Sequence, residues 1–235
     1  MTTPTLAIPD ELDAARSSIL ATPPALQIDM SVTIADVFSG FDIGLFCHTS
    51  AETVWPKLLA LHRRSEKITV QAALRADFDL EFILVAVGFL MPQGAEVIQH
   101  FAVDCGEAVL PLFEKHFPDD LRPRQALAVN RAYLLGSGDE QALTAARAAV
   151  GEALWFYADS PEELAAQHAA KCSGFTFHGP AIAAQIRTRA AIVSAATAVG
   201  LVTGTHVSQG LSTRVGTSAR QFLAPLLLRY ALPTN

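Results

Sequence analysis

The amino-acid sequence predicts a mainly α-helical protein, a multi-helix, bundle-like single domain of residues 1–235. Apolar residues recur at helical spacing along most of the chain, and Pro and Gly clusters separate these stretches. Hydrophobic residues make up 51% of the chain and charged residues only 17%. That balance supplies ample material for a core and argues against disorder.

The first 90 residues are the less regular part. Residues 9–20 predict a short helix, which Pro23 and Pro24 end. Apolar and polar residues then alternate with the period of a strand, so we expect a small β hairpin or an irregular cap within residues 26–47. Candidate N-caps for three further helices are Ser50, Thr69 and Asp77.

Residues 95–117 have the strongest helical pattern. An apolar stripe at spacings of three and four runs along Ile98, Phe101, Ala102, Cys105, Ala108, Val109, Leu112 and Phe113. His100, Asp104, Glu107 and Glu114 are expected towards the other side of this helix. Pro111 should kink it, because proline cannot donate a backbone hydrogen bond.

Five more helices are expected after this one. Asp120 is the predicted N-cap of the next, which should end at Gly136. A helix from residue 139 or 140 to residue 157 follows, and Ser160 with Pro161 starts another. Residues 180–198 and 206–230 complete the series, and their small residues favour close helix–helix approach.

Charge and cysteine usage exclude several classes of function. The formal net charge is −6 with a pI near 5.6, which argues against nucleic-acid binding. Cys47, Cys105 and Cys172 are far apart, so we expect no disulfide framework, metal site or cofactor. The apolar stretches are too short for a bilayer and the N-terminus lacks a signal pattern, so we expect a cytoplasmic protein without membrane contact.

Two polar groupings could carry function, although no common catalytic motif is present. His100 and Asp104 are four residues apart, which suits either a general base with its orienting carboxylate or a surface or helix-stabilising pair. Residues 119–124, Asp-Asp-Leu-Arg-Pro-Arg, could present acids and arginines to a partner. They could equally form a capped turn whose arginines pair with Glu107, Glu114 or the aspartates.

The run from Phe101 to Leu127 resembles the putative immunity protein (immunity-five-like) family of bacterial polymorphic toxin systems. The matching residues are Asp104, Cys105, Glu107, Val109, Leu110, Pro111, Phe113, Glu114, Pro118, Asp119, Asp120, Arg122, Pro123 and Arg124. Gly106 stands where the family usually has Ala, and residues 1–90 match no family pattern. The resemblance implies a helical fold that binds and neutralises a cognate protein toxin. The candidate contact residues are Asp104, Glu107, Asp119, Asp120, Arg122 and Arg124.

Two other functions stay open. A helical enzyme or small-molecule-binding protein would have a pocket closed by residues 26–48, with His100, Asp104, Glu107 or His116 as its polar groups. A regulatory helical module would act as an oligomer, and a homodimer is the simplest form.

Overall fold

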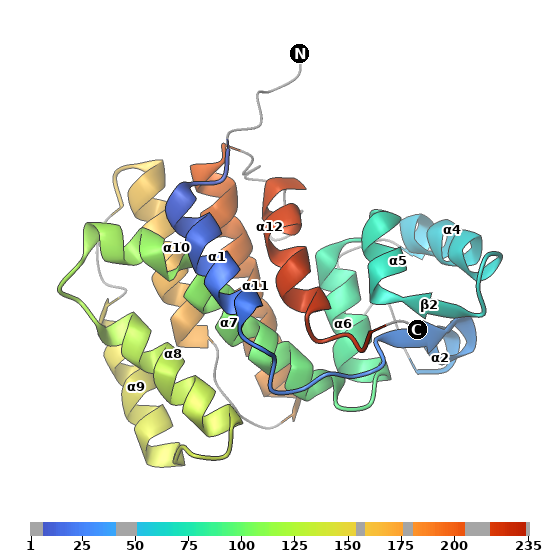
Figure 1. Ribbon diagram of the computed structural model, residues 1–235, viewed down its shortest axis with the longest axis horizontal. Helices are drawn as coiled ribbons and strands as arrows, with labels where there is room; N and C mark the ends of the chain where they lie inside the picture. Colours follow the sequence, from blue (N-terminus) through green and yellow to red (C-terminus); the bar gives the residue numbers. More distant parts are fainter. Residues whose placement is uncertain (1–6, 41–50, 154–157, 176–180, 205–216, 234–235) are drawn as a thin grey trace. The chain divides into compact units, whose positions relative to one another are not determined.

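The computed structural model describes residues 7–40, 51–153, 158–175, 181–204 and 217–233. These residues are mainly helical and include one small two-stranded sheet, which confirms the predicted fold class (Figure 1). Within this described part, no helix combines the length and apolar character needed to cross a membrane. The helices are α1 (Asp10–Ala21), α2 (Ile34–Gly40), α4 (Ala51–His62), α5 (Val70–Arg75), α6 (Leu80–Leu90), α7 (Gly94–His116), α8 (Arg122–Leu134), α9 (Glu140–Ala153), α10 (Pro161–Phe175), α11 (Ala181–Val202) and α12 (Thr217–Leu228), and the strands are β1 (Ser31–Thr33) and β2 (Lys67–Thr69).

The chain divides into two compact units. We call residues 1–25 and 99–226 the helical unit, and residues 26–98 and 227–235 the sheet unit. Two of the boundaries fall inside helices, one within α7 and one within α12. The expectation that the whole chain forms one domain, in the sense of one folding unit, stays a prediction.

In the sheet unit, β1 and β2 pair antiparallel, with Ser31 opposite Thr69 and Thr33 opposite Lys67. The strand period in the sequence is therefore confirmed, but β1 finds its partner beyond α2 and α4 rather than in the next segment. Thr69 ends β2 and also caps α5, because its hydroxyl accepts a hydrogen bond from the backbone N–H of Ala72 at 3.1 Å.

In the helical unit, α7 is buried on nearly all sides between residues 97 and 113. It continues through Pro111 and ends at His116, close to the predicted bounds. Gly106 lies at a close approach of helices, since a Cβ there would be 2.6 Å from Cδ2 of Leu127 on α8. The N-terminal helix α1 is linked to α7 by an ion pair between Glu11 and Lys115 at 3.2 Å.

Helix ends in this unit follow the local rules of the sequence. Gly136, with φ +74°, follows α8 in the left-handed conformation that favours glycine. Asp139 accepts a hydrogen bond from the N–H of Ala142 at 2.7 Å and so opens α9, which forms a helical hairpin with α8 (Figure 1). Ser160 accepts from the N–H of Glu163 at 3.1 Å, which confirms the predicted start of α10.

Helices α10 and α11 make the most extensive helix pair among the described residues. Small side chains are buried in both, among them Ala165, Ala166, Ala169, Ala170, Ala191, Ala195 and Ala198. Small side chains let two helix backbones approach closely, as the Ala-rich sequence predicts. The predicted extension of α9 to residue 157 lies partly outside the described residues.

Candidate partner-binding site

Asp104 lies on α7 and has no exposed surface. The sequence places Asp104 and His100 on the polar side of this helix, but that side is not exposed to solvent here, because His100 is only 2% exposed. Helical periodicity separates apolar from polar positions, but it cannot show that α8 covers the polar side as well. Neither side chain therefore forms the surface pair that was one reading of their spacing.

Arg131 of α8 pairs with two acidic residues of α7, Asp104 and Glu107. Its Nη2 donates to Oδ1 of Asp104 at 2.8 Å, while Nε and Nη2 donate to the two carboxylate oxygens of Glu107 at 2.8 and 2.7 Å. Burial lowers the pKa of the Arg131 guanidinium, but the hydrogen bonds and charges of Glu107 and Asp104 outweigh burial and raise it well above its usual value. The cluster thus joins α7 to α8, with Asp104 fully buried and Arg131 and Glu107 half-buried.

A second ion pair joins the same two helices near the turn between them. Arg124 of α8 donates from Nε and Nη2 to the two oxygens of Glu114 on α7, both at 2.6 Å. The hydrogen bond to Glu114 is the main cause that raises the pKa of Arg124. Such a two-point contact fixes the geometry of both side chains more firmly than a single bond does.

Asp120 and Arg122 form a third pair within the turn itself. Arg122 donates to Asp120 from its backbone N–H at 3.1 Å, from Nε at 2.8 Å and from Nη2 at 2.6 Å. The prediction that Asp120 is the N-cap is wrong by one residue, since Leu121 occupies that position without a side-chain cap bond. Asp120 still accepts a hydrogen bond from the backbone N–H of Arg122, the first residue of α8. It therefore stabilises the start of this helix although it lies outside it.

The sequence allowed two interpretations of residues 119–124, a partner-binding site and a capped turn. In the structure, most of their charged side chains pair with other residues of the protein. Arg122 pairs with Asp120, and Arg124 pairs with Glu114, as the capped-turn reading expects. Arg131 was absent from the sequence-based candidates, although its side chain contacts two of them. A signal was available, because a basic residue on a helix that follows an acidic helix is a natural partner, but the register between the helices was unknown.

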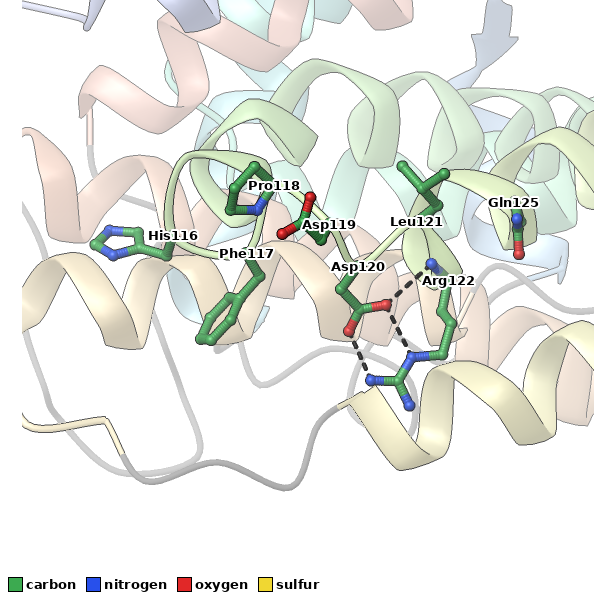
Figure 2. A pocket seen from close by; sticks show the side chains of 8 residues that line it. All are labelled: His116, Phe117, Pro118, Asp119, Asp120, Leu121, Arg122 and Gln125. Carbon is green, nitrogen blue, oxygen red and sulfur yellow. Dashed lines mark hydrogen bonds and ion pairs between the residues drawn. The ribbon is translucent and has the colours of Figure 1, made fainter.

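Asp119 differs from its neighbours. It is exposed, and no ion pair or hydrogen bond of its carboxylate is found within the described part of the chain. It lies in an open groove of about 720 Å³ formed by the α7–α8 turn. The residues lining this groove are His116, Phe117, Pro118, Asp119, Asp120, Leu121, Arg122 and Gln125 (Figure 2).

The remaining candidates occupy separate environments. His116 lines the groove, whereas Asp104 and Glu107 bind Arg131, so the polar groups named for an enclosed small-molecule pocket face different surroundings. Much of the expected lid, residues 41–48 with Cys47, lies outside the described residues. Cys105 and Cys172 are free and buried, and burial is the main cause that raises the pKa of each thiol.

Comparison with protein families gives one match. Residues 90–183 match the family described as Imm-5 like putative immunity protein. The match covers α7 to α10, and with them every one of the candidate charged residues on α7, α8 and the turn. Comparisons with curated proteins and with solved structures found no significant match.

The segment that matches the immunity family is also strongly acidic. It contains twelve Asp and Glu residues against six Lys and Arg residues, a formal charge of −6. Three of the six basic residues, Arg122, Arg124 and Arg131, are held by acidic residues of the same segment. The acids of this segment that these arginines do not hold therefore outnumber its three other basic residues.

Proposed function

We propose that this protein is an immunity-type binding protein that neutralises a cognate toxin by protein–protein interaction. The match of residues 90–183 to the immunity family is the observation that carries the proposal. The acidic excess of the same segment supports it, because an acidic surface accelerates encounter with a basic protein. The toxin would be blocked by occupation of its surface, without chemistry on the part of this chain.

Of the candidate contact residues, those of the α7–α8 turn suit this role better than those inside the helix pair. Asp104 is buried and Glu107 is committed to Arg131, so both serve the scaffold. The turn is exposed and grooved, and a partner reaches it without any rearrangement of the core. Interface backbones commonly move little when such preformed surfaces bind.

The first test combines protection with binding. A toxin-like protein encoded beside this gene is expressed in a sensitive bacterial host with and without this chain, and growth is measured. An inactive variant of the same toxin is then purified and mixed with this chain, and the mass of any complex is measured by size-exclusion chromatography with light scattering. We expect restored growth and a complex of fixed stoichiometry.

The free protein is measured in the same experiment as its own control. Its mass as a function of concentration shows whether it is a monomer or a homodimer before the toxin is added. If no neighbouring toxin-like product binds and none is neutralised, the immunity proposal is wrong.

A further inference from the structure

We propose that the toxin contacts this protein at the exposed face of the α7–α8 turn, which consists of Pro118, Asp119 and Leu121. We further infer that the toxin segment bound there carries a basic side chain next to an apolar one. This inference rests on the proposed function and adds to it the surface and the chemistry of the partner. We call these three residues the turn face.

The turn has two sides with different roles. Figure 2 shows the side chains of Pro118, Asp119 and Leu121 pointing to one side of the turn, and those of Phe117, Asp120 and Arg122 to the other. The second side is closed by the contacts between Asp120 and Arg122. The first side, the turn face, is the one that a partner would meet.

The charges around the turn select a basic partner. Arg122 and His116 both line the groove, and the Arg122 guanidinium lies between the carboxylates of Asp120 at 2.6 Å and Glu152 at 3.9 Å. Because one arginine faces these two acids and Asp119 adds a third, the turn keeps a negative excess. Asp119 is the acid whose oxygens are not already occupied by Arg122, so it is the residue that can accept a cation from outside.

An apolar anchor lies next to this charge. Leu121 is 50% exposed, and Pro118 is also exposed. Leu121 stands at the N-cap position of α8, where a polar residue is the usual choice, so helix formation does not explain it. An exposed apolar side chain beside an unpaired acid is the arrangement that binds a segment with one basic and one apolar side chain.

The turn is also held rigid from both flanks. The Glu114–Arg124 pair ties the end of α7 to the start of α8, and Asp120 binds the backbone and guanidinium of Arg122. A preformed surface loses less conformational entropy on binding than a mobile loop does. The paired residues are therefore positioning residues, and the turn face is the contact.

The test uses full-length variants and the inactive neighbouring toxin that forms the complex described above. Asp119→Lys and Leu121→Ala change the turn face. The control variants are Glu140→Lys and Leu135→Ala, which lie at the opposite end of the α8–α9 hairpin and make the same chemical changes at exposed positions. Dissociation constants are measured by titration calorimetry at two salt concentrations, and circular dichroism checks the folding of each variant.

We expect Leu121→Ala to weaken toxin binding by about tenfold or more, as truncation of an interface anchor does. Asp119→Lys should weaken it by about tenfold or more at low salt and by less at high salt, because salt screens the lost attraction and the new repulsion. Both controls should bind within about twofold of the wild type, as surface changes outside an interface do.

The outcomes separate this inference from the proposed function. If the wild-type chain binds the toxin and the turn-face variants bind it as well as the controls do, the inference is wrong and the immunity role stands. If Asp119→Lys binds more tightly, the toxin segment is acidic and the inferred chemistry is wrong. If the wild-type chain binds no neighbouring toxin, the proposed function and this inference fail together.

Discussion

Nη2 of Arg131 donates a hydrogen bond to Oδ1 of Asp104 at 2.8 Å, and Asp104 has no exposed surface. The same guanidinium also holds Glu107, so one side chain pairs with two acids of α7. A buried carboxylate that loses its cation is strongly unfavourable.

We therefore expect Arg131→Met to lower the free energy of unfolding by about 3–5 kcal/mol, because it leaves Asp104 buried without its cation. Urea unfolding followed by circular dichroism measures this. Arg124→Met is the matched control, since Arg124 is 59% exposed and its pair with Glu114 should contribute less than about 1 kcal/mol. Adding Asp104→Asn to Arg131→Met should restore part of the loss, and equal losses for the two arginine variants would contradict this account.

The pair between Asp120 and Arg122 predicts a dependence on pH. The hydrogen bond from Arg122 is the main cause that lowers the pKa of Asp120 below its usual value of 3.8. A lowered pKa in the folded protein stabilises it above pH 3.8, and the contribution is lost as the pH falls through the lowered value. Asp120→Asn should reduce the free energy of unfolding near pH 6 by less than about 1 kcal/mol, because the pair is partly exposed to solvent.

This difference between Asp120→Asn and the wild type should shrink as the pH falls below 3.8 and through the lowered pKa of Asp120. Unfolding titrations of both proteins between pH 2 and pH 7 measure it. A difference that grows as the pH falls has the wrong sign for this mechanism.

Two glycines on the α8–α9 hairpin should respond oppositely to alanine. Gly136 has φ +74°, where a side chain is strained, so Gly136→Ala should destabilise the protein by about 1 kcal/mol. Gly151 lies inside α9 with open space around it, so Gly151→Ala should stabilise by about 0.5–1 kcal/mol. Thermal unfolding of both variants tests this, and a shift of the same sign in both would refute the conformational explanation.

Gly106 should respond to alanine for a different reason. A Cβ there would be 2.6 Å from Cδ2 of the buried Leu127, so Gly106→Ala should destabilise by about 1 kcal/mol despite its better helix propensity. Leu127→Val removes that part of the obstruction. We expect the double variant to lose less free energy of unfolding than the two single variants lose in sum. A double-mutant cycle by urea unfolding measures this.

The two compact units should unfold together if the chain is one domain. Both α7 and α12 cross the boundary between the units as continuous helices, so melting one unit breaks helices that the other unit shares. The sequence has two tryptophans, Trp55 in the sheet unit and Trp155 in the helical unit. Trp55→Phe and Trp155→Phe variants leave one reporter each, and their fluorescence transitions in urea should coincide. Separate midpoints would show two domains.

Local sequence signals determined the ends of several helices. Ser160, Asp139 and Gly136 act through backbone groups within a few residues of themselves, so their roles are readable without knowledge of the fold. The long amphipathic pattern likewise predicted α7 to within one residue at each end. The family resemblance of residues 101–127 lies inside the segment, residues 90–183, that the family comparison then matched.

Only the tertiary structure decided which charges are free. Asp104, Asp119 and Asp120 are equally polar in the sequence. In the structure, Asp104 is buried under Arg131, Asp120 is held by Arg122, and Asp119 is exposed. The pairing of β1 with β2, which lie on either side of α2 and α4 in the chain, could not be predicted either, because strand period specifies a face and not a partner. The physical reason is the same for Asp104 and for the strand pairing: ion pairs between helices and pairing between strands depend on the register between segments distant in the chain, and local patterns carry no information about that register.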